Sequence, residues 1–222
     1  MTTATAETTT LVSGLHASTP QTLPFARSLA ARAFLLERKA GNVLIYSNGE
    51  LARDADRIRS LGGVSRQYLN HWHESMFGGL PGTGLDAPLF VHEDDAAETR
   101  ERLDVRGTFS RRHSFENDLE VIPAPGHTPG ATAYLWDTGD HRLLFTGDTL
   151  YLSGDEWVAA VLDSSDRPAY VESLEQLREV EFDVLVPWAA SAGGAPYMML
   201  DDGEGAERIQ AVIERLRRGQ NR

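Results

Sequence analysis

Two histidines that could bind a metal ion lie close together in the stretch NHWHESMFGG, which covers residues 70–79. His71 and His73 are two residues apart and follow an apolar run, and a strand that ends in this way delivers two imidazoles to one ion. The next letters, ESMF, stand where a two-metal enzyme would need further ligands. The stretch therefore indicates either a working site with fewer metals or the remains of a metal site.

Two more polar side chains occur in the same sequence context. His127 in PGHTPG and Asp148 in FTGD each follow an apolar strand and lie in a loop that contains glycine. Residues at strand ends of a layered α/β protein gather at one rim, where binding sites are built. The chain has no cysteine, so a transition metal must be held by histidine and carboxylate. Three imidazoles and one carboxylate that converge would form a site for Zn, Fe or Mn.

The elements that must position these residues alternate between strand and helix periodicity. Predicted strands cover 33–37, 42–47, 66–70, 88–92, 119–123, 131–136, 142–146 and 183–187, and predicted helices begin near 51, 93, 166 and 209. This order predicts two sheets faced by helices in one α/β domain over residues 10–222, after a loose leader at residues 1–9. The acidic run at 93–95 is expected to be a solvated helix start.

The set H-x-H, PxPGHTPG and LFTGD resembles the metallo-β-lactamase superfamily in order and spacing. The likeness runs from the strand pair near residue 33 to the strand at 183–187. It implies a four-layered αββα sandwich of metallo-β-lactamase type. It also implies that His71, His73 and His127 bind the first metal, and that Asp148 completes the site.

The second metal site of that family is missing from this sequence. Its members take an aspartate and a histidine from H-x-H-x-D-H, and a further histidine from a turn after the last core strand. Ser75, Met76 and Ala189 occupy those places here, and none of them is a good ligand for such a cation. A mononuclear site is therefore expected. The side chains expected to fill the vacated volume are Trp72, Met76, Phe77 and Trp188.

A single Zn held by three imidazoles lowers the pKa of bound water towards ~7 and polarises a carbonyl. The resemblance thus implies a hydrolase that acts on a small ester, thioester, lactone or amide, with Asp148 orienting the site. In relatives the aspartate at position 75 also orients the attacking water. Glu74 is the candidate to replace it, although neighbouring side chains on an extended segment point in opposite directions.

Two alternatives to a zinc hydrolase remain open. Two histidines and a carboxylate also form the site of non-haem iron oxygenases, and persulfide dioxygenases of this superfamily use such a site. Those enzymes keep the full H-x-H-x-D-H string, so Zn ranks before Fe and Mn as the one divalent metal. The other alternative is a non-catalytic descendant that uses the old cleft to bind a ligand or partner with little or no metal.

Charge and composition restrict the partners. There are 21 Lys and Arg against 33 Asp and Glu, for a net charge of −12, and such a surface repels nucleic acid and anionic lipid. No window of ~18 apolar residues exists, and the N-terminus lacks the features of a signal peptide. We therefore expect a cytoplasmic protein with a small-molecule substrate, no nucleic-acid or membrane partner, and a homo-oligomer as an open possibility.

Overall fold

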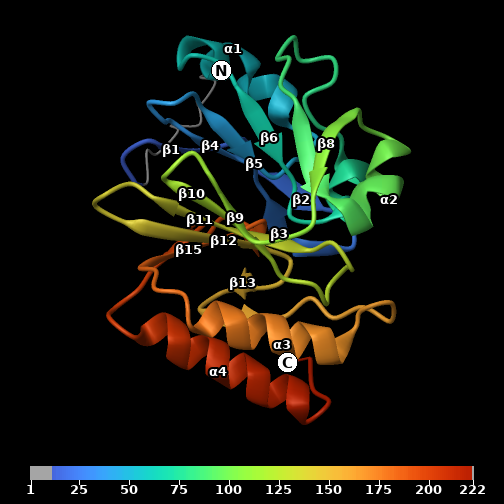
Figure 1. Ribbon diagram of the computed structural model, residues 1–222, viewed down its shortest axis with the longest axis vertical. Helices are drawn as coiled ribbons and strands as arrows, with labels where there is room; N and C mark the ends of the chain where they lie inside the picture. The colour runs from blue at the N-terminus through green and yellow to red at the C-terminus, as the bar shows by residue number, and fades with distance from the viewer. Residues whose placement is uncertain (1–11, 222) are drawn as a thin grey trace, which may run out of the picture.

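The computed structural model describes residues 12–221, and the leader predicted at residues 1–9 lies outside this range. Two six-stranded sheets face each other between layers of helices, which confirms the predicted αββα sandwich (Figure 1). In spatial order, the first sheet contains β1 (Leu15–Ala17), β4 (Phe34–Leu36), β5 (Val43–Ile45), β6 (Arg66–Tyr68), β7 (Leu89–His92) and β8 (Val105–Phe109). The second contains β17 (Met198–Met199), β15 (Val184–Pro187), β12 (Arg142–Gly147), β11 (Thr132–Asp137), β10 (Leu119–Pro123) and β9 (His113–Phe115).

Helices cover the outer faces of both sheets. The helical segments are α1 (Leu51–Ser60), the 3₁₀ helices η1 (Trp72–Phe77) and η2 (Glu93–Asp95), α2 (Ala96–Arg100), α3 (Arg167–Arg178) and α4 (Glu204–Arg217). In Figure 1, α3 and α4 lie side by side below the second sheet, and α1 lies at the opposite end beyond the first sheet. Within residues 12–221, no helix combines the length and apolar character needed to cross a membrane.

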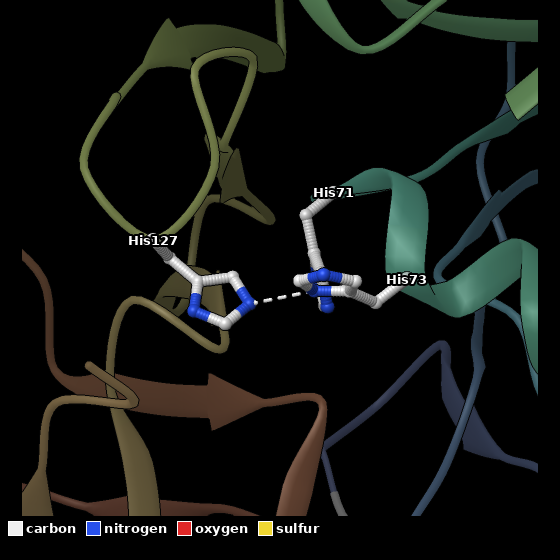
Figure 2. A group of neighbouring side chains, drawn as sticks. All are labelled: His71, His73 and His127. Carbon is white, nitrogen blue, oxygen red and sulfur yellow. Dashed lines mark hydrogen bonds between the residues drawn. The ribbon is translucent and has the colours of Figure 1, made fainter. Parts of the chain in front are cut away.

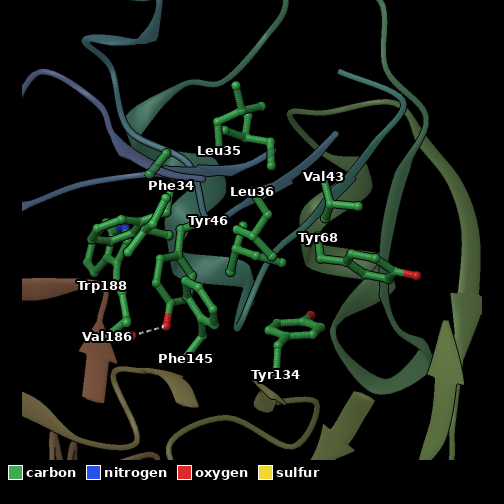
Figure 3. Packing of buried hydrophobic residues seen from close by; sticks show 14 of the residues in the cluster. Phe34, Leu35, Leu36, Val43, Tyr46, Tyr68, Tyr134, Phe145, Val186 and Trp188 are labelled. Carbon is green, nitrogen blue, oxygen red and sulfur yellow. Dashed lines mark hydrogen bonds between the residues drawn. The ribbon is translucent and has the colours of Figure 1, made fainter. Parts of the chain in front are cut away.

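The core between the sheets is built from aromatic and branched side chains that both sheets contribute (Figure 3). Phe34, Tyr46 and Phe145 meet edge to face, with ring centroids 6.1 Å apart in each pair. Strand β11 is buried over five successive residues, because helices cover one face and the first sheet covers the other. A second apolar cluster fills the space between this sheet and the helices α3 and α4.

Two smaller sheets lie beside the sandwich, and sequence periodicity did not indicate them. They are β13 (Tyr151–Ser153) with β14 (Glu156–Val158), and β16 (Ala189–Ser191) with β3 (Ala26–Ala31) and β2 (Gln21–Leu23). Strand β16 pairs with β3 through Ala189 and Ala31, which brings the β2–β3 hairpin beside the end of β15. The helix predicted from residue 93 is also shorter than expected, since it forms only η2 and the five-residue α2.

Candidate metal centre

Three histidines from two loops meet at one point, as the sequence predicts. One ring nitrogen from each of His71, His73 and His127 lies within 4.8 Å of the other two. Figure 2 shows His71 and His73 entering from η1 and His127 entering from the facing loop, with their rings converging. His71 and His127 are each 2% exposed. The three nitrogens are therefore close enough together to coordinate a common ion.

The backbone around His71 changes direction at this residue. His71 is extended, with φ −154° and ψ 161°, and forms the N-cap of η1. The sequence analysis treated Glu74 and Ser75 as neighbours on an extended segment, and this is wrong, because residues 72–77 form a 3₁₀ helix. In such a helix, side chains three residues apart lie on the same side. Glu74 accordingly folds back towards His71.

Asn70, which the sequence analysis did not single out, fixes the tautomer of His71. Its amide nitrogen donates to the carbonyl oxygens of Thr132 and Thr146, the latter at 3.2 Å. Its Oδ1 accepts a bond from the backbone N–H of Asp148 at 3.2 Å. Because these partners fix the orientation of the amide, the 2.9 Å contact from Oδ1 to Nδ1 of His71 requires a proton on Nδ1. Nε2 of His71 is then a bare lone pair.

His127 is fixed in the same tautomer by a different partner. Its Nδ1 donates to the carbonyl oxygen of Ala160 at 2.6 Å, so Nε2 carries the lone pair. That Nε2 lies 3.1 Å from Nδ1 of His73, the bond drawn in Figure 2. The loop itself is held where Gly126 packs against the backbone of Tyr170, and a Cβ at position 126 would lie 2.4 Å from the Tyr170 Cα.

Asp148 faces the same point from the end of β12. Its Oδ2 lies 3.5 Å from Nε2 of His71 and 3.6 Å from Nε2 of His127. Burial raises the pKa of the Asp148 carboxyl, and the nearby His127 opposes this effect. The preceding residue, Gly147, has φ +56° and lies against the Asn70 side chain. The carboxylate is thus placed by the same asparagine that orients His71.

Burial keeps two of the imidazoles neutral. It lowers the pKa of His71 well below the usual value, with smaller contributions in the same direction from His127 and His73. Burial and the neighbouring His127 lower the pKa of His73 to about 4. Neutral imidazole is the form that coordinates a metal. The cluster is therefore ready to bind a cation at neutral pH.

The donor set fits a divalent transition metal. Nε2 of His71 is buried and has no hydrogen-bond partner. It faces a carboxylate oxygen at 3.5 Å, and a cation between these two acceptors would satisfy both of them. Imidazole and carboxylate ligands suit Zn and Fe. His71, His73, His127 and Asp148 are the residues that would hold such an ion.

Glu74 has a structural position that differs from the role expected for it. Its carboxylate is fully buried and accepts hydrogen bonds from the backbone N–H groups of Ser47 at 2.8 Å, Asn70 at 2.7 Å and His71 at 3.3 Å. It lies 3.5 Å from Nδ1 of His71, whereas Nε2 of that ring faces Asp148. The side chain therefore ties η1 to the loop after β5 and does not face the point where the nitrogens meet.

Asp95, expected to be solvated, is 1% exposed and connects the two histidine loops. Its carboxylate accepts hydrogen bonds from the backbone N–H of Trp72 at 2.9 Å, the hydroxyl of Thr128 at 2.7 Å and the backbone N–H of Gly130 at 2.8 Å. It thereby joins Trp72, which lies between His71 and His73, to Thr128 and Gly130 in the loop that carries His127. The acidic run gave no sign of this, because its partners are far away in the sequence.

Apolar side chains adjoin the metal centre where relatives are expected to have second-metal ligands. The Trp188 indole lies edge-on to the His71 ring at 5.6 Å and to the Phe77 ring at 5.2 Å, and its Nε1 donates to the carbonyl oxygen of Ser47. Trp72 instead lies beside His73, with ring centroids 4.0 Å apart. Met76 is half exposed, so it fills little of the interior.

Comparison with known proteins gives a consistent result. The family model described as the metallo-beta-lactamase superfamily matches residues 51–189. The uncharacterized protein YmaE of Bacillus subtilis is 26% identical over 137 residues, which cover 60% of this chain and 50% of that protein. A hydroxyacylglutathione hydrolase of Anaeromyxobacter dehalogenans is 35% identical over 96 residues, 41% of this chain and 36% of that protein. The chain thus matches half or less of the length of these relatives.

The likeness to solved structures covers nearly the whole chain. A metallo-beta-lactamase from Pontibacter korlensis superposes with a TM-score of 0.71 and 18% sequence identity, covering 94% of this chain and 97% of that one. At this level of identity the agreement is one of fold.

Proposed function

The chain belongs to the metallo-beta-lactamase superfamily, and from this premise we propose that it is a metal-dependent hydrolase with a single divalent ion, Zn before Fe or Mn. Its expected substrates are small esters, thioesters, lactones or amides. The observation that carries the proposal is the bare, buried Nε2 of His71, which faces Asp148 with no other partner. The similarity to a hydroxyacylglutathione hydrolase, a protein named for hydrolysis, supports the reaction class.

The residues of the site divide the chemistry among themselves. A divalent metal, when bound, lowers the pKa of water and polarises a carbonyl group. His71, His73 and His127 hold the ion because each presents one nitrogen to the same point. Asp148 would complete the set through Oδ2, and the carboxylate oxygen that does not face the ion would accept the proton that an attacking water loses and return it to the leaving group.

The expectation of one ion follows from the side chains next to the cluster. Ser75 and Met76 offer no carboxylate or imidazole, and Trp188 with Phe77 occupies the adjoining interior. Glu74 is occupied by three backbone N–H groups, so it is not free to bind a second ion. A dinuclear mechanism therefore has too few ligands here.

Elemental analysis of protein purified without added metal tests the proposal. We expect close to one ion per chain, hydrolysis of 4-nitrophenyl acetate that a chelator abolishes, and loss of both in His127→Ala. His113→Ala is the matched control, because His113 lies on β9, outside the cluster, and its ring is hydrogen-bonded to the backbone carbonyl of Arg111. Clearly more than one ion per chain, or an ion kept in full by His127→Ala, would contradict the proposal. Iron with consumption of O₂ would favour the dioxygenase-like alternative.

A second candidate function is a ligand-binding protein without catalysis. It is favoured by the direct 3.1 Å bond between His73 and His127, which satisfies two of the three nitrogens without an ion. This candidate predicts no tightly bound metal and no ester or thioester turnover. Tight metal that supports hydrolysis and is lost in His71→Ala would exclude it.

A further inference from the structure

A pocket of about 690 Å³ opens directly over the metal centre. Its floor contains His73, His127 and Asp148, and its wall includes Trp188. The volume lies within the range of roughly 300–1,000 Å³ that is usual for sites that bind small molecules. A group bound in this pocket would therefore lie against the residues to which the proposed function assigns the chemistry.

The walls of the pocket are mainly apolar and come from separate parts of the chain. The β2–β3 hairpin contributes Leu23, Phe25 and Leu29, and the segment 158–162 contributes a run of Val, Ala and Leu. Phe77 extends the apolar wall from η1. Such walls favour a ligand with hydrocarbon surface, because burial of that surface releases ordered water.

Among residues 12–221, no Lys or Arg side chain lines this pocket. Asp148 is the one charged residue among those that line the pocket. The net charge of −12 adds to the negative potential around its mouth. A carboxylate or phosphate on the acyl chain, away from the metal centre, would meet no Lys or Arg side chain among the lining residues, and it would have to give up water without a partner.

The mouth of the pocket is also apolar. Among the described residues, four large hydrophobic side chains are exposed: Phe25 at 74%, Met76 at 50%, Met199 at 48% and Leu162 at 44%. Three of the four, Phe25, Met76 and Leu162, line this pocket. Exposed apolar groups that gather around one opening indicate a binding site, whereas scattered ones carry no such meaning.

We propose that this pocket selects substrates with a neutral, apolar acyl chain, and that it discriminates against substrates with a carboxylate or phosphate on that chain. This inference rests on the proposed hydrolase function, because it places the scissile carbonyl at the His73–His127 floor. The acyl chain lies between the β2–β3 hairpin and the segment 158–162. Each added methylene then raises kcat/KM by roughly two- to fourfold until the pocket is full.

A neutral series and one matched anion test this selectivity with the metal-loaded full chain. The substrates are the 4-nitrophenyl esters of acetate, butyrate, hexanoate and octanoate, and the mono-4-nitrophenyl ester of adipate. We expect kcat/KM to rise along the neutral series and hexanoate to exceed adipate at least about tenfold. Hydrolysis that is independent of chain length, or equal rates for hexanoate and adipate, would overturn the inference and leave the proposed function intact.

Binding to metal-free protein gives a readout that needs no turnover. The neutral fluorophore N-phenyl-1-naphthylamine serves as the probe, with hexanamide, octanamide and adipic acid monoamide as competitors. We expect octanamide to displace it best and the monoamide of adipic acid at least about tenfold less well than hexanamide. If no ester is hydrolysed above the His127→Ala background, the proposed function fails, and this displacement series alone decides the inference. Absence of probe binding, or equal displacement by the anion, would overturn it.

A pair of charge substitutions locates the selectivity. Leu162→Arg places a cation at the mouth, and Met199→Arg makes the same change at an equally exposed residue of β17 that does not line the pocket. We expect the hexanoate-to-adipate ratio to fall about fivefold or more in Leu162→Arg and to stay within about twofold in Met199→Arg. Equal shifts in the two variants would show that overall charge sets the ratio and would refute the assignment to this pocket.

Discussion

Oδ1 of Asn70 lies 2.9 Å from Nδ1 of His71, and this contact decides which nitrogen of the ring faces the metal centre. The amide of Asn70 cannot turn over, because its nitrogen faces two carbonyl oxygens and its oxygen faces the N–H of Asp148. Orientation of a histidine through its second nitrogen is a common way to position a metal ligand. Asn70 therefore organises His71 and Asp148 together, although it is not itself a ligand.

Asn70→Ala is expected to weaken metal binding about 10- to 100-fold, since it frees the His71 ring and the backbone of Asp148. It should also lower the free energy of unfolding by about 2 kcal/mol or more, because two carbonyl groups lose a donor. Metal titration with a competing chelator measures the first effect, and urea denaturation measures the second.

Asn42→Ala is the matched control for this variant. Asn42 is also a buried asparagine with hydrogen bonds to two carbonyl oxygens, those of Leu61 and Gly63, but it lies in the turn after β4. The Asn42→Ala variant should have a lower free energy of unfolding than wild type and an unchanged affinity for metal. Unchanged affinity in Asn70→Ala would show that the His71 ring is positioned without the asparagine.

Glu74→Gln separates a structural from a catalytic role for this residue. The variant places an amide NH₂ against backbone N–H groups that now donate to a carboxylate, and we expect a loss of about 1–3 kcal/mol in the free energy of unfolding. kcat per bound metal should stay within about twofold of wild type, because the side chain does not face the site. A fall of about 100-fold in kcat with stability retained would restore the water-orienting role expected from the sequence.

The sequence predicted that these four side chains converge, because the signal for this is local. His71, His73, His127 and Asp148 each follow an apolar strand, and strand ends in a layered fold meet at one rim. The alternation of strands and helices likewise predicted four of the six strands in each main sheet, and the helices α1, α3 and α4. Asp166, where a helix was predicted to begin, is the N-cap of α3, and its side chain accepts the N–H of Ala169 at 3.0 Å.

The parts that the sequence did not predict depend on contacts between distant residues. Asn70 and Asp95 look like ordinary polar residues until their partners, more than 20 residues away, are known. The β2–β3 hairpin pairs with β16 across more than 150 residues, and its strands have little apolar alternation. The orientation of the Glu74 side chain was not predicted, because the segment after His71 has no helix signal. The conformation of this segment is determined by backbone N–H groups that surround the buried Glu74 carboxylate.

The metal-free protein is expected to lose stability in mild acid through His73. The imidazole pKa is about 6.5 in the unfolded chain and about 4 in the folded protein. Between these values the unfolded state binds more protons, so the His73 contribution is fully present above pH 6.5 and decreases as the pH falls towards 4. The slope for one group is at most about 1.4 kcal/mol per pH unit, and partial exposure of His73 reduces it.

Comparison with His73→Gln isolates this effect from its neighbours. The lowered pKa of His71 also reduces stability as the pH falls. The raised pKa values of Asp148 and Glu74 have the opposite effect on stability. Urea denaturation in the presence of a chelator, from pH 7.5 to pH 4.5, should therefore show wild type losing stability relative to the variant below about pH 6.5. If the difference in the free energy of unfolding between wild type and His73→Gln stays constant over this pH range, the lowered pKa of His73 is contradicted.

Gly147 tests how tightly the asparagine and the aspartate are held together. A Cβ at this position would lie 1.9 Å from Cγ of Asn70, and the backbone has φ +56°. Gly147→Ala must therefore displace the Asn70 side chain as well as strain the backbone. We expect the variant to lower the free energy of unfolding by roughly 3 kcal/mol or more and to remove most of the metal affinity. Gly139→Ala is the control, because Gly139 has φ +89° with no atom within 4 Å of the added Cβ, so it should cost only about 1 kcal/mol. Urea denaturation and metal content of both variants check this expectation, and similar costs in the two would mean that Asn70 can move aside without loss.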